Sequence, residues 1–427
     1  MLTLTRRLLT VGLLVAALLS FASPAIAEGE AIKGTLIVRL DDVRSPVEGV
    51  TVIVSQEGIE VGSATSDSDG AWIVPVPGAG TYQVRIDTST FPDGVTLTDP
   101  DKAELPAVEV TDGQEKTVLF PLGEGATQTV STYERVGTLF VAGLKLGAVI
   151  ALSAVGLSLI YAVTGLVNFA HGEMVTLGAV LAYFFATSPD GPQWPLLMAA
   201  IPAVLLGAGF GWAQDRGLWR HLRKSGMGLI SMMVVSIGLS FAMRHLILVV
   251  FSGQRRLFGD FSGQSPVRIL GIPMVPRHLV TIAVAVVVLG AIGLFLQRTK
   301  AGTAVRAVSD DTDLAESSGI NVDRVITITW VMAGGLAALG GIFFGVNEAV
   351  QWDMGFRLLL LIFAAVVLGG LGTAYGAMLG GFVVGITVEM STLFVPSELK
   401  SAIGLLLLIV MLLVRPQGLL GTRERIG

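Results

Sequence analysis

The feature that constrains this chain most is the succession of apolar segments that fills its second part. A helix needs about 20 predominantly apolar residues to cross the hydrocarbon core of a bilayer. Only 14% of the residues of the chain are charged, against about 25% in average soluble domains. The sequence therefore predicts a polytopic α-helical membrane protein of about 8–9 spans. We expect the spans near 137–161, 166–187, 194–213, 228–251, 278–297, 325–346, 358–372, 375–394 and 401–415.

The first 27 residues have the form of a secretory signal peptide. Arg6 and Arg7 precede an apolar run at 8–21, and the small-residue sequence Ala-Ile-Ala ends at Ala27. A basic region, a short apolar region and a small-residue cleavage site define such a peptide. The apolar run is also short for a membrane span. We therefore expect 1–27 to be a signal peptide, with an uncleaved first helix as the alternative.

Residues 28–122 show a different pattern, in which apolar residues alternate with polar ones. Runs such as "GTLIVRL", "GVTVIVSQ" and "TYQVRID" are separated by turns rich in glycine, proline and aspartate, which is typical of short β-strands. Residues 28–136 carry 19 acidic and 7 basic residues, a net charge of −12, whereas 137–427 carry 14 and 19, a net charge of +5. We expect an all-β sandwich domain at 28–122 and a linker at 123–136.

The stretch "SATSDSDGAWIVPVPGAGTYQVRI" resembles the carboxypeptidase-regulatory-like, transthyretin-like sandwich family. The resemblance implies a fold and no activity. Asp67, Asp69 and Gly70 look like part of a calcium loop, but the further oxygen ligands and the distal glutamate of that motif do not follow. A plain turn is the preferred interpretation.

Basic residues indicate the orientation of the spans, because short cytoplasmic loops carry an excess of Lys and Arg. Three segments outside the spans are rich in basic residues, and counting the spans between them puts all three on one side of the membrane. The same count of spans puts residue 136 and the sandwich on the extracytoplasmic side, where a signal peptide would send them. The loop 252–277 is an exception, since it is expected outside and is also basic. A cytoplasmic tail at 422–427 completes the chain. The basic residues of the three segments are Arg216, Arg220, Arg223 and Lys224; Arg298, Lys300, Arg306 and Arg324; and Arg415, Arg423 and Arg425.

Motifs for catalysis and for nucleotide binding are absent from the sequence. There is no G-x-x-x-x-G-K-[ST], H-E-x-x-H or G-x-S-x-G, the four histidines are scattered, and the chain contains no cysteine. These motifs would supply a phosphate cradle, a zinc site and a nucleophile respectively. We therefore expect no enzyme, no cofactor or metal site in this chain, and no nucleic-acid partner.

Polar residues interrupt the apolar pattern at 163–173, where "GLVNFAHGE" contains Asn168, His171 and Glu173. Ionisable groups at membrane depth usually face protein or a water-filled cavity. They could shape a translocation path, or they could satisfy backbone groups that a break in the helix leaves free. A second interruption, at 369–376, suggests a pair of broken helices.

Arg244 and Glu389 raise the same question within other predicted spans. Arg244 could line the path or could extend its guanidinium toward the outer surface. Glu389 is expected to be paired or to face a cavity. We place both among the candidate residues of the translocation path.

The loop 298–324 is predicted to contain a short amphipathic helix. Val305, Val308, Leu314 and Ala315 would form its apolar stripe, while acidic residues project elsewhere and Gly319 ends the helix. A stripe of this kind on the cytoplasmic face would suit docking into the groove of a partner.

Four motifs now identify a family. "YAVTGLVNFAHGEMVTLGA", "AGTAVRAVSDDTDLAESSGINVDRVITITWVMAGGLAALGGIFFG", "VVLGGLGTAYGAMLGG" and "RPQGLLG" together resemble the LivH-type permeases, over about 140–421. Those are membrane subunits of ABC importers for branched-chain amino acids and related small amides. The resemblance implies a permease domain at 137–421 in the cell membrane, in contact with membrane lipid.

The same resemblance implies the partners of the chain. These are a second, similar permease, two cytoplasmic ATPase subunits that bind the ATP and Mg²⁺, and an extracytoplasmic solute-binding protein. The loop 298–324 would be the coupling helix that contacts an ATPase. Residues that match the family pattern there are Arg306, Ala307, Asp310, Ala315, Gly319 and Ile320.

The sequence departs from the family at two places, which leaves the substrate open. Leu361 stands where the family often has lysine, and the stretch "VQWDMGFR" contributes Trp352, Asp353 and Arg357. The leading hypothesis is import of branched-chain or other small amino acids. One alternative is a permease for urea or a short amide, and another is a surface receptor or adhesion protein with the sandwich as its working part.

Overall fold

The computed structural model describes residues 30–40, 43–56, 58–111, 115–123, 131–259, 264–415 and 417–421. The predicted signal peptide at 1–27 and the tail at 422–427 lie outside the described residues. The chain divides into two compact units, Met1–Thr129 and Val130–Gly427. We call them the β unit and the helical unit, and each is described by itself.

The described residues of the β unit form ten strands, which confirms the period-two pattern. One sheet has four strands in the order β5-β4-β7-β8, and two smaller sheets have the orders β6-β1-β9 and β10-β2-β3. All pairs are antiparallel except β1 with β9 and β2 with β10. The strands are β1 (Ala31–Thr35), β2 (Ile37–Leu40), β3 (Val43–Pro46), β4 (Thr51–Gln56), β5 (Ile59–Thr65), β6 (Ala71–Pro75), β7 (Gly80–Ile86), β8 (Glu104–Val110), β9 (Glu115–Thr117) and β10 (Leu122–Gly123).

Alternate residues of these strands meet in one core. In β4, Val52 and Val54 are buried while their neighbours are partly exposed. They join Tyr82 of β7 in the same sheet, Trp72 of β6 and Phe120 between β9 and β10. Because side chains of a strand alternate between its two faces, one face of each sheet supplies this core. The predicted turn is also present, since the Asp67 carboxylate accepts hydrogen bonds from the backbone N–H groups of Asp69 and Ala71.

Each of the nine predicted apolar segments corresponds to a helix of the helical unit. Among the described residues, six helical segments are long and apolar enough to cross a membrane, and three shorter apolar helices accompany them. The helices of the nine segments are α2 (Thr132–Thr164), α3 (His171–Ala186), α4 (Leu196–Gln214), α6 (Leu229–Phe251), α7 (Pro276–Arg298), α10 (Val322–Asn347), α11 (Met354–Gly369), α12 (Ala374–Met390) and α13 (Lys400–Val414). The connections contain the π-helical turn η3 (Asp215–Trp219), α5 (Arg220–Lys224), a hairpin of β11 (Val267–Ile269) and β12 (Ile272–Met274), α8 (Lys300–Asp310) and α9 (Thr312–Ser317). Short 3-10 turns follow α12 and precede α13.

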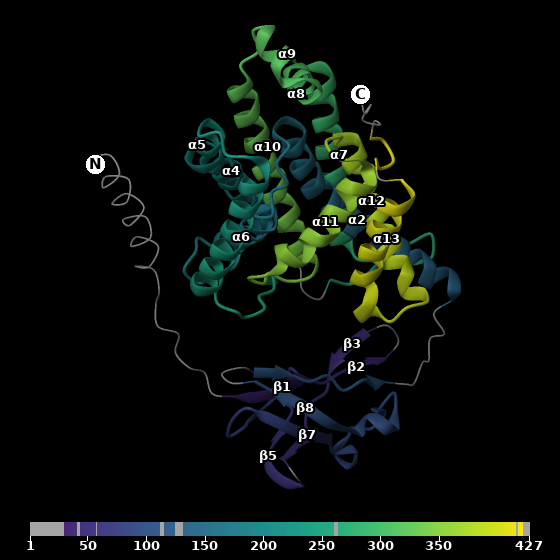
Figure 1. Ribbon diagram of the computed structural model, residues 1–427. Helices are drawn as coiled ribbons and strands as arrows, with labels where there is room; N and C mark the ends of the chain where they lie inside the picture. Colours follow the sequence, from purple (N-terminus) through teal and green to yellow (C-terminus); the bar gives the residue numbers. More distant parts are fainter. Residues whose placement is uncertain are drawn as a thin grey trace, which may run out of the picture. The chain divides into compact units, whose positions relative to one another are not determined.

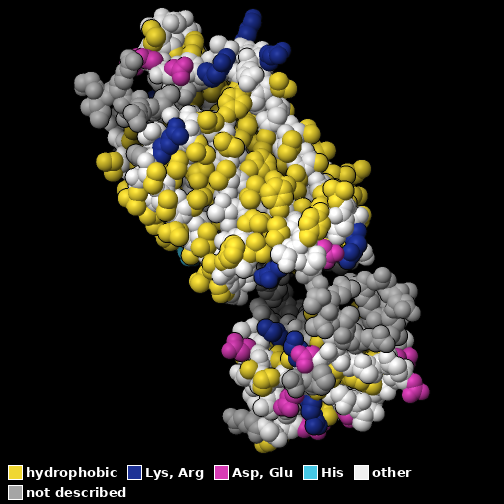
Figure 2. Space-filling view, turned by 90° about the vertical axis from the view of Figure 1, so that its right-hand side faces the viewer, with side chains coloured by type: hydrophobic (Ala, Val, Ile, Leu, Met, Phe, Trp, Pro, Cys, Tyr) yellow, Lys and Arg dark blue, Asp and Glu magenta, His cyan; other side chains and the backbone are white. Residues whose placement is uncertain are grey.

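Helix α2 is the centre of the helical unit. Of the most apolar 18-residue stretch of α2, 89% is buried, whereas the corresponding stretches of the α4, α6 and α7 segments are 22%, 28% and 28% buried. Figure 2 shows a broad hydrophobic surface on one side of this unit, with Lys and Arg side chains at its two ends. A surface of this kind matches the hydrocarbon core and the polar boundaries of a bilayer.

Small residues pack the central helices closely. Gly143 and Gly147 of α2 face Gly381 and Gly385 of α12, where an added Cβ would meet the backbone of the opposite helix. Close backbone contact through small residues is the usual means of helix association in lipid, which offers no hydrophobic drive. Most glycines of the spans therefore have a packing role.

The two interruptions that the sequence suggested as a pair differ in structure. The second is a tight turn between α11 and α12, closed by the Thr373 hydroxyl, which donates to the carbonyl of Gly370 at 2.7 Å. The first is a segment of six residues, 165–170, between α2 and α3. The first is followed, in the first turn of α3, by the buried ionisable side chains of His171 and Glu173.

Candidate functional site

The non-helical segment 165–170 carries its polar side chains into the interior of the helical unit. The Asn168 side chain is fully buried, and its amide oxygen accepts a hydrogen bond from the N–H of Ala170 at 3.1 Å. The Ser236 hydroxyl of α6 accepts the N–H of Phe169 at 3.1 Å. These contacts satisfy backbone groups that the break in the helix leaves free, as required where water is scarce.

His171 begins α3 and is also fully buried. Its Nε2 lies 2.9 Å from the carbonyl oxygen of Ser153 in α2. That carbonyl belongs to a continuous helix, so the ring links the two helices. The other ring nitrogen, Nδ1, is buried and has no hydrogen-bond partner among the described residues.

Glu173 and Arg244 form a buried ion pair that sequence reasoning did not find. The guanidinium nitrogens Nε and Nη2 of Arg244 lie 3.0 and 2.9 Å from Glu173 Oε1, and Nη2 also donates to the Ser240 hydroxyl at 3.1 Å. The guanidinium stands over the Phe356 ring, 3.7 Å from its centroid. Arg244 therefore turns inward from α6 toward α3, and the expectation that it extends to the outer surface is wrong.

The first turns of the short helices α3 and α11 meet next to this pair. An added Cβ on Gly172 would lie 2.6 Å from the carbonyl oxygen of Gly355. The Thr176 hydroxyl accepts the N–H of Gly355 at 3.0 Å and donates to the Gly172 carbonyl at 3.3 Å. The positive ends of two helix dipoles thus approach each other in the interior. Broken helices whose N-termini meet inside a bundle are a feature of transporter sites.

Glu389, the fifth predicted path residue, lies elsewhere. It is near the end of α12 and accepts a hydrogen bond from Lys400 of α13 at 3.1 Å. It lines a cavity that contains none of the other four candidates. The structure therefore brings Asn168, His171, Glu173 and Arg244 together and separates Glu389 from them.

The predicted amphipathic helix is present as two helices, α8 and α9, at one end of the helical unit (Figure 1). Asp311 separates them, because its carboxylate accepts the N–H of Leu314 at 2.9 Å and so caps α9. Gly319 ends α9 with a φ of +85°. The N–H of Gly319 donates to the Glu316 carbonyl and the N–H of Ile320 to the Ala315 carbonyl, which is the Schellman arrangement.

The apolar stripe of this segment is not available to a partner. Val305, Val308 and Ala315 are buried in the core of the helical unit itself, whereas Leu314 is 64% exposed. The stripe instead holds α8 and α9 against their own chain. The prediction that the stripe docks into a partner is therefore wrong, and the exposed surface contains Leu314 and acidic side chains.

The predicted coupling residues of this segment divide in the same way. Arg306, Asp310 and Gly319 are exposed, Ala307 and Ile320 are partly buried, and Ala315 is buried. The first three can contact a partner directly. The others position the two helices, since Ala307 and Ile320 pack against the core cluster to which Ala315 belongs.

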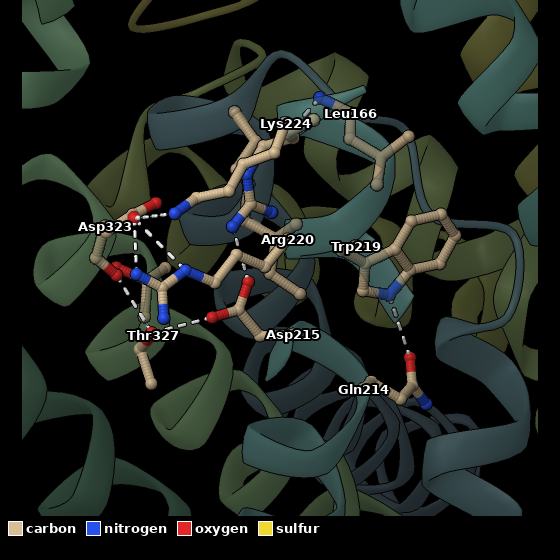
Figure 3. A network of polar contacts seen from close by, with 12 residues as sticks. Leu166, Gln214, Asp215, Trp219, Arg220, Lys224, Asp323 and Thr327 are labelled. Carbon is tan, nitrogen blue, oxygen red and sulfur yellow. Dashed lines mark hydrogen bonds and ion pairs between the residues drawn. The ribbon is translucent and has the colours of Figure 1, made fainter. Parts of the chain in front are cut away.

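Polar contacts join the turn after α4 to the beginning of α10 at the same end (Figure 3). Arg220 and Lys224 pair with Asp323 at 2.6 and 3.5 Å. Asp215, in the π-helical turn, has no exposed side-chain surface and pairs with Arg223 at 2.7 Å. The basic loop 216–224 therefore has structural contacts in addition to the charge that orients the spans.

Thr327 adds a second contact to this network, because its hydroxyl donates to the other carboxylate oxygen of Asp215 at 2.7 Å. Trp219 stacks on Trp330 with ring centroids 5.7 Å apart. The network borders an open cavity of about 1000 Å³, lined by the end of α2, α5, α8, α9 and the first turn of α10. We call this end of the helical unit the α8–α9 end.

The arginines of the basic loop 252–277 have partners within the chain. Arg255 donates to the carbonyl of Glu348 at 2.7 Å, Arg256 lies over the rings of Tyr183 and Phe251, and Arg268 pairs with a glutamate of α2 at 3.1 Å. These contacts give a structural reason for basic residues in a loop whose charge does not follow the predicted orientation.

Lys145 of α2 pairs with Glu348 at 3.3 Å, a contact that the sequence analysis missed. The lysine side chain is 9% exposed. The available signal was a lone lysine inside the first apolar run, together with a glutamate just after another span. Which of several distant carboxylates would meet it could not be read from the sequence.

In the helical unit, apolar helices pack against one another and a hydrophobic surface faces outward. Polar contacts lie at the broken helix and at the two ends of the unit. These features define a multi-pass membrane permease. The chain belongs to the family described as branched-chain amino acid transport system / permease component, which matches residues 139–412. Proteins of this family are permease components of transport systems and not enzymes.

Curated relatives cover the same part of the chain. The high-affinity branched-chain amino acid transport system permease protein LivH of Salmonella typhimurium is 32% identical over 292 residues, which are 66% of this chain and 94% of the relative. BraD of Pseudomonas aeruginosa, with the same description, is 30% identical over 296 residues, 66% of this chain and 95% of the relative. A probable branched-chain amino acid transport permease protein LivH of Methanocaldococcus jannaschii is 25% identical over 287 residues, 64% of this chain and 88% of the relative. No solved structure matches the chain.

Proposed function

We propose that the chain is the membrane-spanning permease subunit of an ABC importer and forms the translocation path for branched-chain amino acids. The family match over 139–412 carries this proposal, and the named functions of the relatives support the substrate class. A surface receptor or adhesion protein would need a single span, whereas this chain has six helical segments long enough to cross a membrane.

The proposed orientation puts the α8–α9 end in the cytoplasm. Most basic residues of the helical unit that stand outside its apolar segments lie in the loops of that end, in agreement with the positive-inside rule. The β unit then lies outside the cytoplasm, where the predicted signal peptide would direct it. The proposed partners are a second permease of the same kind, two cytoplasmic ATPase subunits that bind ATP and Mg²⁺, and an extracytoplasmic solute-binding protein.

Helices α8 and α9 are the proposed contact with an ATPase subunit. The apolar side of the two helices packs against the core of their own chain. Their outer side is exposed and carries the apolar Leu314 and the acidic Asp310 and Glu316. A partner groove with an apolar pocket for Leu314, basic side chains opposite the two carboxylates and an acidic side chain opposite Arg306 would complement this surface. Arg306, exposed on α8, is the proposed cationic contact.

The proposed translocation path passes the broken helix. Asn168, His171, Glu173 and Arg244 form its supporting structure, because each of the four side chains contacts another group of the chain. They are proposed to hold the meeting point of α3 and α11 in place rather than to bind the substrate.

Uptake by a strain that lacks its own branched-chain amino acid importers tests the transport assignment. The complete importer should restore uptake of radiolabelled leucine, isoleucine and valine. Uptake of urea or acetamide, with no uptake of the three amino acids, would refute the proposed substrate class while leaving the permease assignment in place.

Copurification tests the proposed ATPase contact. Arg306→Glu should abolish recovery of the ATPase subunits with the tagged permease, while the amount of permease in the membrane is unchanged. Arg324→Glu is the matched control, because Arg324 is exposed at the same end but lies outside α8 and α9. Equal recovery of the ATPases with both variants would contradict the proposed contact.

A further inference from the structure

A second cavity lies at the end of the helical unit opposite to α8 and α9. Helix α10 fixes this relation, because its first residues line the cavity at the α8–α9 end and Glu348, just after its last residue, lines the second cavity. The second cavity has a volume of about 270 Å³. Sites for drug-sized ligands measure roughly 300–1000 Å³, so this one suits a smaller molecule. We call it the outer cavity.

Charges of both signs line the outer cavity. Glu348 and Glu389 supply carboxylates, and Arg255, Arg357 and Lys400 supply cations. The Glu389 side chain is 11% exposed and pairs with Lys400, so its charge is held in a partly desolvated position. Close electrostatic contacts are stronger in such a position than in bulk water.

Arg357 differs from the other cations of the cavity in its exposure and geometry. Arg357 lies in the first turn of α11 and pairs with Asp353 at 2.7 Å, but its side chain remains 63% exposed. A guanidinium has five donors in a planar fork, and one pair leaves several of them free to hold a second carboxylate. Oxygen Oδ1 of Asp353 is buried without a hydrogen-bond partner among the described residues.

Four aliphatic side chains form part of the wall of the outer cavity, which Phe344, Ala349, Gln351 and Met354 also line. Leu146 of α2, Leu358 and Leu361 of α11, and Val388 of α12 line it, and all four are buried. A wall of this kind accepts an apolar side chain and offers no partner to a polar one.

We propose that the outer cavity is a binding site for a zwitterionic aliphatic α-amino acid on its way into the membrane. The ammonium group contacts Glu389, the α-carboxylate contacts Arg357, and the aliphatic side chain packs against Leu361 and its neighbours. This inference rests on the proposed function, since the cavity faces the solute-binding protein only in the proposed orientation. The same ionic groups occur in the headgroup of phosphatidylethanolamine, which the experiment must separate from an amino acid.

Direct binding to the importer without its solute-binding protein tests the inference. The importer is placed in nanodiscs of phosphatidylglycerol, which lacks an ammonium group, and saturation-transfer NMR compares leucine, leucinamide and 4-methylpentanoate. Leucinamide lacks the carboxylate and 4-methylpentanoate lacks the ammonium. We expect leucine to bind at least tenfold more tightly than either analogue.

Variants assign the two charges. Arg357→Gln should weaken leucine binding at least tenfold and abolish the preference over leucinamide, and Arg357→Lys should restore part of the affinity. Arg268→Gln is the matched control, because Arg268 is similarly exposed, at 61%, and has one ion pair outside the cavity. Glu389→Gln should abolish the preference over 4-methylpentanoate. If that variant does not fold, Arg357→Gln still decides the question, since its side chain is on the surface.

Three results would overturn the inference. The first is equal binding of leucine and leucinamide, and the second is unchanged leucine binding by Arg357→Gln. The third is that phosphatidylethanolamine, added to the discs, abolishes leucine binding equally in wild type and variant. Uptake separates this failure from failure of the proposed function. If wild type and both variants import leucine at the same rate, the outer cavity is not a substrate site but the importer assignment stands. If the wild-type importer takes up no branched-chain amino acid, both proposals fail.

Discussion

Replacing Arg244 with methionine should destabilise the helical unit strongly, because it leaves Glu173 without its counter-ion. The Glu173 side chain is 1% exposed, and the Arg244 side chain is 9% exposed. Both contacting nitrogens of Arg244 lie on the same oxygen of Glu173, while Oε2 has no hydrogen-bond partner among the described residues. Removing Arg244 therefore removes the ionic contacts of that carboxylate, although the chain cannot expose it to water.

The magnitude follows from the physics of buried ion pairs. Breaking such a pair by removing one partner costs about 3–5 kcal/mol, whereas replacing both partners with groups of similar volume is often nearly neutral. We expect Arg244→Met to lower the free energy of unfolding by about 4 kcal/mol. Glu173→Gln should cost less, about 2 kcal/mol, since Arg244 keeps the Ser240 hydroxyl and the Phe356 ring. The double variant should lie within about 1 kcal/mol of the wild type.

Unfolding in mixed micelles, followed by tryptophan fluorescence, provides the double-mutant cycle. The coupling between the two sites, which is the sum of the two single losses minus the loss of the double variant, should be about 5 kcal/mol. Arg268→Met is the control, because its ion pair with Glu134 is exposed and should contribute less than about 1 kcal/mol. A loss below about 1 kcal/mol for Arg244→Met, or additive effects in the double variant, would refute the reasoning.

Two further predictions concern packing and hydrogen bonding. Gly172→Leu should abolish the folded, monodisperse peak in size-exclusion chromatography, because the new side chain would overlap the backbone of Gly355. Gly217→Leu is the control and should leave the peak unchanged, since nothing lies within 4 Å of an added Cβ there. Thr327→Val should lower the free energy of unfolding by about 1–2 kcal/mol, because it removes the 2.7 Å hydrogen bond to the buried carboxylate of Asp215; stability equal to that of wild type would contradict this.

The helices were predictable because apolar length and period are local properties of the sequence. Each of the nine apolar segments is a helix, and the alternating runs before them are strands of one core. Gly319 was also predictable as a helix end, since only glycine adopts a φ of +85° without strain. Such features depend on neighbouring residues and on the solvent around them.

The partners of polar side chains were not predictable in the same way. His171 and Glu173 stand two residues apart, yet one contacts Ser153 and the other contacts Arg244, on two different helices. The apolar stripe of α8 and α9 was visible in the sequence, but a stripe has the same pattern whether it packs on its own chain or on a partner. The structure assigns it to the chain's own core.

The sequence by itself determined a membrane permease preceded by a β domain, because apolar length, alternation and family motifs are written along the chain. Tertiary structure decided which charges meet. Ion pairs such as Lys145 with Glu348 join residues 203 positions apart, and only the packing of helices brings them within reach. In lipid, an unpaired charge is expensive, so each such pair is a requirement of the fold that no local pattern records.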